Sequence, residues 1–528
     1  MDADLRSIQQ ARDLLRAASE AQHALKAAGQ AEVDRIVAAM AEAGASAAER
    51  LGRLAQEETG FGRADDKAEK NLFATRTLAE RMEGMMTVGI VNKSEDGAVW
   101  EVATPMGVVA ALIPSTNPTS TAMYKAIISA KARCGIVMSP HPRAKACTAE
   151  ALHVVAEAAY RAGAPRGLFG CMTEVTLAGT DALLEDPNTD VILATGGAAM
   201  VKAAYSKGKP AYGVGSGNVP AYVDRSADVE KAAADLVTGA SFDWGTLCSS
   251  ERSVIADAPI RTKLLEAMKQ HGAHVCSVEE TEKLRRIVKV KGRLNIDIVG
   301  QSPSRIAGMA GFSVPEGTRV IVAEVAEVGK GEPLSMETLS PILSFYAADG
   351  WEAGCERCIE ILEFGGIGHT LALHAGSERV IEQFALRKPS MRIVVNTVAA
   401  LGSIGMTTDL FPAMTLGPGT IGGSITSDNI SPLHLLNIKR VAFETRPINP
   451  SQQESKPFVE APHSGSTGDG SWMEEIESRL RDRAGSAPIR KPEVRVQPTQ
   501  SAEPRRQTLA LPESEIDALI ERFKKVGG

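Results

Sequence analysis

Aromatic residues and cysteine are scarce in this sequence, and basic residues are slightly outnumbered by acidic ones. Phe, Trp and Tyr together make up 4% of the 528 residues, so small aliphatic side chains must form most of the core. The 7 cysteines show no regular spacing, which excludes a disulfide framework and favours reduced thiols in a cytoplasmic protein. A formal net charge of -7 argues against a nucleic acid as the partner.

Long apolar runs and metal-binding patterns are missing as well. No segment approaches the about 20 apolar residues that span a membrane, and the first residues lack the basic and apolar regions of a secretory signal. Cys355 and Cys358 form one C-x-x-C pair, without a second pair or a neighbouring His that would complete a metal site. We therefore expect a cytoplasmic protein with no membrane association and no bound metal.

The sequence does contain an alternation of short apolar runs and helical patterns. Residues 1 to about 85 show helical spacing, and two β-rich runs at 87–104 flank a turn. Strand-like runs and helical segments then alternate at 108–113, 120–132, 136–139, 148–162, 191–194, 198–206 and 221–223. A second set follows, with strands at 253–256, 320–325, 342–346, 370–374 and 393–396. This order predicts an α/β fold with two parallel-sheet lobes and a small β element.

The composition changes after about residue 447. Residues 448–510 are rich in Pro, Ser, Gln and charge, which predicts a disordered linker. In residues 511–528 an apolar stripe repeats at helical spacing, formed by Ile516, Leu519, Ile520 and Phe523. Acidic residues fill its first turn and basic residues its last, as the helix dipole favours. We predict an amphipathic helix there; a membrane-bound helix and a helix docked on its own core are the alternatives.

One cysteine stands in a context that favours catalysis. Cys248 lies in the segment 241–250, and taken alone it would more often be a structural thiol. Asn117 follows the predicted strand 108–113 and is flanked by prolines. Strand ends of a parallel sheet face the ligand crevice, so the Asn117 amide can donate to a developing oxyanion. The alternative is that Asn117 caps the next helix.

Two glycine-containing segments are candidate sites for a phosphate-bearing ligand. In 191–197 a strand leads through small residues into a helix, which is either an anion site or an ordinary tight turn. In 212–220 three alternating glycines either allow a close backbone approach or form a plain surface loop. The segment 417–422 fits G-x-G-x-x-G literally, but its internal Pro and the loop after it argue against a dinucleotide-binding turn.

Together these segments resemble the aldehyde dehydrogenase superfamily. The likeness is greater to its CoA-acylating branch, the acetaldehyde and propionaldehyde dehydrogenases of bacterial microcompartments and of bifunctional alcohol/aldehyde dehydrogenases. The motifs that carry it are IPSTNPTS (113–120), SPHPRAK (139–145), ILATGG (192–197), GVGSGNVPAYVD (213–224), TLCSSERSV (246–254), ETLSPIL (337–343), GHT (368–370) and TLGPGTIGGSITSDNISPLHLLNIK (415–439). The match covers roughly residues 5 to 447.

The resemblance implies a role for each matching residue. Cys248 would attack the aldehyde carbon of a short-chain aldehyde, and Asn117 with the Cys248 backbone N–H would hold the oxyanion. Hydride would pass to NAD and leave a thioester on Cys248, whose acyl group coenzyme A would receive. The residues expected at the cofactor are Ile113, Pro114, Ser115, Thr195, Gly196, Gly197, Gly215 and Glu337, the last of them on a ribose.

Two departures favour the acylating branch over the hydrolytic one. Hydrolytic members carry a Glu in the segment that matches 212–220, as the base for the deacylating water, and this sequence has no acid there. They also carry a Lys where this sequence has SPHP (139–142), so the preference for NAD over NADP depends on Glu337. His141 and His369 are either structural or assist deprotonation of a thiol. A hydrolytic enzyme and a non-catalytic scaffold are the alternatives.

The resemblance also divides the chain. It implies a cofactor-binding domain at 1–236 that carries an oligomerisation hairpin at 87–104, a catalytic domain at 237–424 and an oligomerisation strand at 425–447. We therefore expect a homo-oligomer, a dimer or a tetramer. The segment 511–528 resembles an encapsulation peptide, which directs enzymes into bacterial microcompartments. It implies contacts with a microcompartment shell or with its core enzymes, and a location in the microcompartment lumen.

Overall fold

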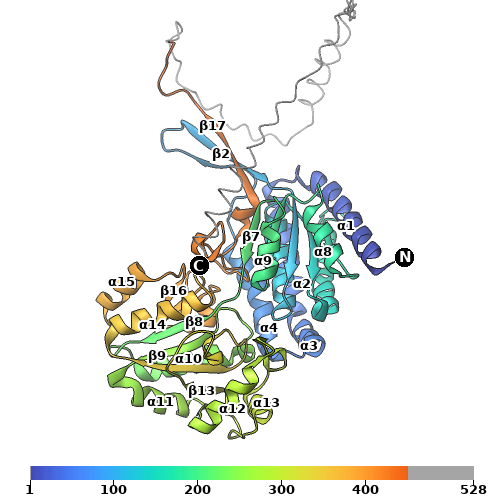
Figure 1. Cartoon of the computed structure of the whole chain (residues 1–528). Coiled ribbons are helices and arrows are strands. Elements are labelled where there is room, and N and C mark those ends of the chain that lie inside the picture. Colours follow the sequence, from blue (N-terminus) through green and yellow to red (C-terminus); the bar gives the residue numbers. More distant parts are fainter. Residues whose placement is uncertain (1, 450–528) are drawn as a thin grey trace, which may run out of the picture. The chain divides into compact units, whose positions relative to one another are not determined.

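The computed structural model of the chain describes residues 2–449 of the 528. The chain separates into two units, Met1–Arg446 and Pro447–Gly528, and the first contains every helix and strand described below (Figure 1). The predicted linker and C-terminal helix lie almost entirely outside the described residues, so they stay predictions.

The first sheet has five parallel strands in the order β5-β4-β3-β6-β7. They are β3 (Val108–Ile113), β4 (Gly135–Pro140), β5 (Phe169–Cys171), β6 (Val191–Thr195) and β7 (Ala211–Val214). Successive side chains of β3 point to opposite faces, and every one of them is buried. The sheet is therefore covered on both sides, as the uninterrupted apolar run predicted.

Helices from the N-terminal half cover the two faces of this sheet. The core on one face combines side chains of α2 (Gln30–Ser46), α6 (Pro118–Lys131) and α7 (Lys145–Arg161). The core on the other face combines side chains of α1 (Ala3–Leu25), α8 (Leu177–Glu185) and α9 (Ala198–Tyr205). The remaining N-terminal helices are α3 (Ala48–Thr59), α4 (Ala64–Leu72) and α5 (Leu78–Arg81). Within the described residues no helix is both long and apolar enough to cross a membrane.

The second sheet has seven parallel strands in the order β10-β13-β14-β9-β8-β15-β16. They are β8 (Val219–Val223), β9 (Glu251–Asp257), β10 (Ala273–Val275), β13 (Val320–Glu324), β14 (Ile342–Ala348), β15 (Leu371–His374) and β16 (Ile393–Val395). One core includes α10 (Val229–Ser241) and α11 (Arg261–Gln270), and another includes α14 (Gly350–Phe364) and α15 (Glu378–Arg387). Smaller elements are α12 (Val278–Val288), β11 (Lys289–Val290), β12 (Arg293–Leu294), α13 (Pro303–Ala310) and α16 (Ala399–Gly402). The predicted α/β fold with two parallel-sheet lobes is confirmed.

The strand pairing corrects the predicted domain boundary at residue 236. β8 pairs with β9 and β15 of the second sheet, so the chain leaves the first sheet between β7 and β8. The segment that makes this crossing is the glycine-rich loop 215–218. A boundary at 236 would separate β8 from the sheet in which it is buried.

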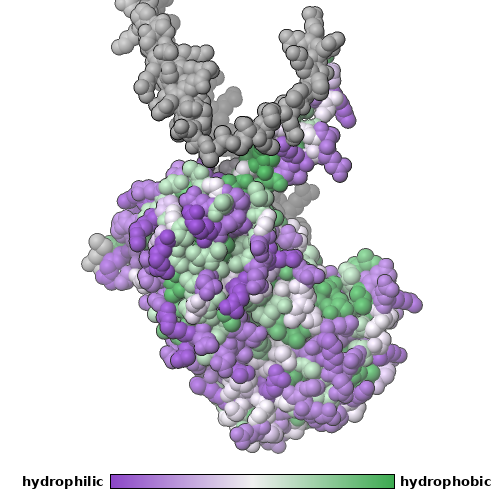
Figure 2. All heavy atoms as spheres, turned by 180° about the vertical axis from the view of Figure 1, so that it is seen from behind, coloured by the Kyte–Doolittle hydropathy of each residue, from purple (hydrophilic) through white to green (hydrophobic). Residues whose placement is uncertain are grey.

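A third sheet forms an arm that projects from the lobes (Figure 1). The predicted hairpin is present as β1 (Gly89–Lys93) and β2 (Val99–Pro105), and β17 (Leu436–Ala442) pairs antiparallel with β2. The hairpin and the segment 425–447 therefore meet in one small sheet, in which β17 is an edge strand. Figure 2 shows a largely hydrophilic surface with apolar patches, one of them beside this arm.

Candidate active site

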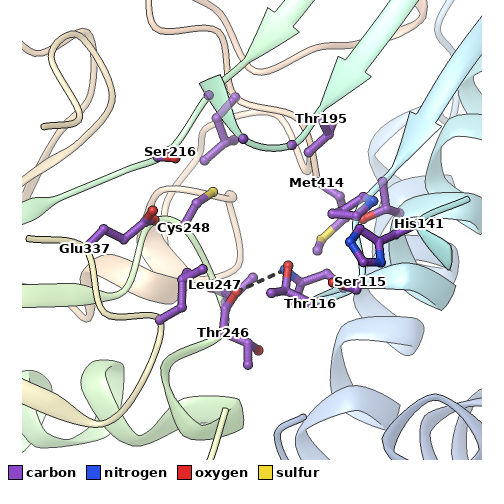
Figure 3. Close-up of a pocket in the computed structure, with 18 of the residues that line it drawn as sticks. Ser115, Thr116, His141, Thr195, Ser216, Thr246, Leu247, Cys248, Glu337 and Met414 are labelled. Carbon is purple, nitrogen blue, oxygen red and sulfur yellow. Dashed lines mark hydrogen bonds between the residues drawn. The ribbon is translucent and has the colours of Figure 1, made fainter. Parts of the chain in front are cut away.

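A cavity of about 240 Å³ lies where the carboxyl ends of β3, β4, β6 and β7 meet loops that precede β9 and β14 (Figure 3). The strand-end rule for parallel sheets therefore places the ligand crevice correctly for the first lobe. The predicted site residues that line the cavity are Pro114, Ser115, Asn117, His141, Thr195, Gly196, Gly197, Gly215, Cys248 and Glu337. Residues from eight separate segments of the sequence thus meet around one space.

Cys248 is a half-buried thiol between η3 (Phe242–Gly245) and the start of β9. Burial raises the pKa of the Cys248 thiol to about 12, and the Glu337 carboxylate adds to the rise, whereas Arg392, Arg252 and the Cys248 backbone N–H oppose it. The resting thiol is therefore almost fully protonated near neutral pH. The Cys248 backbone N–H lies close to the thiol. It could therefore donate a hydrogen bond to an oxyanion that forms on the carbon bound to Cys248.

The glycine at 217 brings another loop into contact with Cys248. A Cβ added to Gly217 would lie 2.0 Å from the backbone oxygen of Cys248, so only glycine fits there. The Gly217 N–H donates to Glu337 Oε1 at 3.0 Å. The alternating glycines therefore do allow a close backbone approach, and the partner is the peptide of Cys248 itself. The alternative of a plain surface loop is not observed at Gly217.

Asn117 lies at the start of α6, but its side chain makes no capping hydrogen bond to that helix. Its Nδ2 donates to the backbone oxygen of Thr246 at 3.2 Å and to Thr116 Oγ1 at 3.2 Å. Its Oδ1 accepts from Lys70 Nζ at 2.5 Å. The helix-cap alternative is therefore not observed, and the amide N–H side faces the loop that carries Cys248.

Glu337 is the one acid among the described residues that line this cavity. Burial raises the pKa of Glu337 to about 7, although Arg252, the Gly217 N–H and the Ser216 hydroxyl lower it. Figure 3 shows Glu337 and Cys248 pointing into the same space from different elements. A carboxylate in this position can accept hydrogen bonds from a ribose, and it also disfavours ionisation of Cys248.

A second cavity of about 490 Å³ continues from the first, because His141 and Met200 line both. It lies between α8 and α9, and most of its walls are apolar, including Leu112, Pro140, Val175 and Leu184. Gly197 precedes α9, and a Cβ there would meet nothing within 4 Å. The two cavities together have room for an extended dinucleotide, with the small residues 195–197 between its ends. This apolar slot was not predicted from the sequence, because its walls come from four separate segments of the chain.

Two predicted site residues do not line either cavity. Ile113 is 1% exposed, and it contributes its backbone oxygen as the acceptor from the His141 N–H at 2.9 Å. His369 is also 1% exposed, and burial, with Arg392 nearby, lowers the pKa of its imidazole to about 3. His369 is therefore neutral and sits behind Gly217, where an added Cβ would lie 3.5 Å from its Cε1. This placement agrees with the structural alternative for His369.

His141 lies at the junction of the two cavities. Its Nδ1 accepts from the Arg143 N–H at 3.1 Å, and burial, together with Arg143, lowers its pKa. A neutral imidazole here can accept or donate one hydrogen bond to a bound nucleotide or thiol.

One group of side chains among the described residues has metal-ligating chemistry. Ligand atoms of His274, Cys276 and Glu280 lie within 4.8 Å of one another at the end of β10. His274 Nε2 and Glu280 Oε2 are 3.3 Å apart, and Glu280 also completes the capping box of α12, which accounts for its position. The expectation of no bound metal stays a prediction.

Comparison with known proteins identifies the family. Residues 3–283 match the aldehyde dehydrogenase family model, and the chain belongs to this family. Over 419 residues it is 39% identical to the bifunctional aldehyde-alcohol dehydrogenase AdhE of Escherichia coli. The aligned region covers 78% of this chain and 47% of that protein. The chain thus spans about half the length of this curated relative. It is 36% identical to the acetylating succinate-semialdehyde dehydrogenase of Clostridium kluyveri, covering 80% of this chain and 93% of the relative.

Solved structures of acylating enzymes share the fold. An acetylating aldehyde dehydrogenase from Geobacillus thermoglucosidasius is 50% identical, with a TM-score of 0.84, and covers 85% of this chain and 100% of its own. A propionaldehyde dehydrogenase from the fucose utilisation microcompartment of Clostridium phytofermentans is 28% identical, with a TM-score of 0.76. The match covers 82% of this chain and 97% of that one. A Rhodopseudomonas palustris propionaldehyde dehydrogenase with bound CoA and an acylated cysteine is 26% identical, with a TM-score of 0.74 and coverage of 82% and 97%.

Proposed function

We propose that this protein oxidises a neutral short-chain aldehyde to its acyl-CoA, with NAD as the hydride acceptor and coenzyme A as the acyl acceptor. The observation that carries the proposal is a nucleophilic thiol, Cys248, in a cavity whose glycine loop supplies no general base for water. The Glu337 carboxylate already accepts a hydrogen bond from the Gly217 N–H. A thiol is a better nucleophile than water towards a thioester, so coenzyme A can complete the reaction without such a base.

The chemistry divides into two half-reactions. The Cys248 thiol loses its proton to water, and its sulfur forms a bond to the aldehyde carbon. The π electron pair of the carbonyl moves onto its oxygen, which then accepts hydrogen bonds from the Asn117 amide and the Cys248 N–H. When bound, NAD supplies the hydride acceptor, and loss of hydride from the former aldehyde carbon leaves an acyl thioester on Cys248. The coenzyme A thiol then loses its proton and its sulfur forms the new thioester bond, while the bond to the Cys248 sulfur breaks and that sulfur regains a proton.

The residues present fit a dinucleotide in shape and polarity. The slot between α8 and α9 offers apolar walls for an adenine, and residues 195–197 leave space for phosphates. Glu337 would hold a ribose near Cys248. Asp181 lines the slot, but Lys207 pairs with its carboxylate at 2.8 Å, so the preference for NAD over NADP depends on Glu337 alone.

The cavity around Cys248 favours an uncharged aldehyde. Side chains of Leu247, Ile404, Met414 and Leu416 line it, and no Lys or Arg is among the described lining residues. The carboxylate of a semialdehyde would enter without a partner for its charge, which is unfavourable. We therefore infer acetaldehyde- or propionaldehyde-sized substrates, in contrast to the substrate in the name of the Clostridium kluyveri relative.

Dependence on coenzyme A tests the proposal directly. Purified protein, a short-chain aldehyde and NAD should give one NADH per active site without coenzyme A, followed by sustained turnover when coenzyme A is added. The physical reason is that the thioester on Cys248 has no efficient route to water. Absorbance of NADH and detection of acyl-CoA over a series of aldehyde lengths, with succinate semialdehyde as the anionic comparison, measure both halves. Sustained NADH production without coenzyme A would favour a hydrolytic enzyme instead, and no NADH at all would favour a non-catalytic scaffold.

We further propose that the β-arm makes the protein a homo-oligomer, a dimer or a tetramer. β17 is an edge strand, and the arm exposes apolar side chains, among them Ile90, Val441 and Phe443. Exposed edges and apolar patches are typical of strands that pair with another subunit.

The microcompartment assignment rests on the apolar stripe of 511–528 and on the likeness to a microcompartment enzyme. A helix this short is marginal alone and would fold on a partner surface. Deletion of 505–528 should abolish co-localisation with a microcompartment shell in cells and leave kcat and KM in solution within about twofold, because the site lies within 2–446. Fluorescence co-localisation and steady-state kinetics measure the two effects. A collapse of solution activity would instead show that the tail belongs to the catalytic body.

A further inference from the structure

A buried cluster of charges lies behind Asn117, and the reaction scheme above does not use it. The side chains of Lys67, Lys70 and Asp243 are each at most 2% exposed. Both lysines donate to Asp243 Oδ2, so two ammonium groups face one carboxylate. Buried charges are costly unless paired, and a surplus cation in the interior calls for a further partner.

The further partner of Lys70 is the Asn117 side chain. Lys70 Nζ donates to Asn117 Oδ1 at 2.5 Å. An ammonium group has no acceptor, so it can contact only the oxygen of an amide and never its NH₂. The Asn117 Nδ2 must then lie on the opposite side, where it reaches the Thr246 backbone oxygen at 3.2 Å. Lys70, which can only donate, and the Thr246 carbonyl, which can only accept, together fix the orientation of the amide.

Asp243 connects the same cluster to the turn that carries Cys248. Its carboxylate also accepts from Thr246 Oγ1 and, at 2.6 Å, from the Arg63 N–H. Asp243 and Trp244 have φ angles of 48° and 49°, which non-glycine residues seldom adopt and which persist only where the surroundings hold them. One carboxylate therefore anchors both the lysine behind the amide and the unusual backbone that leads into Cys248.

We propose that Lys70 is a positioning residue for the oxyanion site: held by Asp243, it locks the Asn117 amide with its N–H towards the oxygen of the thiohemiacetal on Cys248. Its positive charge also polarises the amide and so strengthens the N–H as a donor where negative charge develops. The proposal rests on the proposed function, because it assigns a role in the first half-reaction.

The protonation of Lys70 supports this role and gives it a pH dependence. Burial lowers the pKa of Lys70 to about 8; Asp243 and Asp66 oppose the drop, and Lys67 adds to it. Above that pH Lys70 becomes a neutral amine, which can accept as well as donate and no longer carries the positive charge that polarises the amide. The wild-type rate of hydride transfer, divided by that of Asn117→Ala, should therefore fall as pH rises through about 8, because ionisation of Cys248 contributes to both rates alike.

A double-mutant cycle tests the coupling between Lys70 and Asn117. Lys70→Met should lower kcat for NADH formation by about 10- to 100-fold, with the KM values for aldehyde and NAD changed by less than about threefold. The double variant with Asn117→Ala should be no slower than Asn117→Ala alone, because Lys70 acts through that amide. Lys67→Met is the matched control: it shares the helix and Asp243, but donates to the Thr116 backbone oxygen at 3.0 Å and not to Asn117. It should lower kcat less and add to the effect of Asn117→Ala.

Three results would overturn the proposal: an unchanged kcat in Lys70→Met, additive effects of Lys70→Met and Asn117→Ala, or an equal coupling for Lys67→Met. If Lys70→Met does not fold, the pH profile decides without it. The ratio of the wild-type to the Asn117→Ala hydride-transfer rate should fall above about pH 8; a ratio that stays constant through that range would refute the assignment. A wild type that makes no acyl-CoA would instead refute the proposed function, so the two failures are distinguishable.

Discussion

Cys248→Ala is expected to abolish NADH formation and acyl-CoA formation alike while the protein stays folded. Cys248 carries the only thiol among the described residues that line the two cavities, so no neighbouring sulfur can take its place. Loss of a covalent nucleophile costs about 10⁴-fold or more in kcat. Alanine keeps the Cβ in a half-buried position, so the melting temperature should change by less than about 4 °C. Stopped-flow absorbance at high enzyme concentration and thermal unfolding measure both effects.

Cys276→Ala is the matched control for this experiment. Cys276 is also half-buried. Burial raises the pKa of its thiol to about 12, and the Glu280 carboxylate adds to the rise, but Cys276 lies outside both cavities. It should retain full activity. Single-turnover NADH formation by Cys248→Ala at the wild-type rate would refute the covalent mechanism.

Gly217→Ala should cause the second-largest loss. The added Cβ would lie 2.0 Å from the Cys248 backbone oxygen, so either the glycine loop or the turn with Cys248 must move. A displacement of about 1 Å at the reacting atoms costs about 100-fold in rate, and we expect kcat/KM to fall by about that factor or more. The Gly217 N–H that donates to Glu337 would shift as well, so the KM for NAD should rise.

Gly365→Ala controls for the change from glycine to alanine near the same loop. A Cβ there would meet Asn218 Cβ at 3.5 Å, which is ordinary contact, and its φ of -166° suits any residue. Activity should stay within about twofold of wild type. Steady-state kinetics and the rate of iodoacetamide labelling of Cys248 report on the geometry in both variants. A Gly217→Ala variant with wild-type kinetics and labelling would show that the loop tolerates the Cβ, contrary to the packing described.

The secondary structure of the two lobes was largely predictable from the sequence. Buried parallel strands appear in a sequence as uninterrupted apolar runs. β3 has the bounds of its predicted run, and β14 begins at the residue where its predicted run begins. The sheet to which β8 belongs was not predictable, because a strand's own residues do not record which neighbour it pairs with. Its pairing with β9 and β15 depends on contacts made more than 25 residues away in the chain, which only the folded arrangement decides.

The candidate site was predictable where a local rule applied. Asn117 and Thr195 lie just beyond or at the ends of parallel strands, and both line the cavity. Ile113 and His369 also lie in matching motifs, but the direction and burial of their side chains depend on the packing around them. Lys70 was missed, because a lysine on a charged helix reads as solvent-exposed until a buried carboxylate from a distant turn is placed beside it.

The sequence by itself determined the reactive group and the absence of an acid from the glycine segment, because both are matters of residue identity. It also determined the strands, because period and apolarity are local properties. Only the tertiary structure decided which groups surround the thiol: Gly217 against its backbone, Glu337 facing it, and Lys70 holding the Asn117 amide. These depend on contacts between segments up to 173 residues apart, the separation of Lys70 and Asp243, and such contacts are fixed by packing and by the pairing of buried charges.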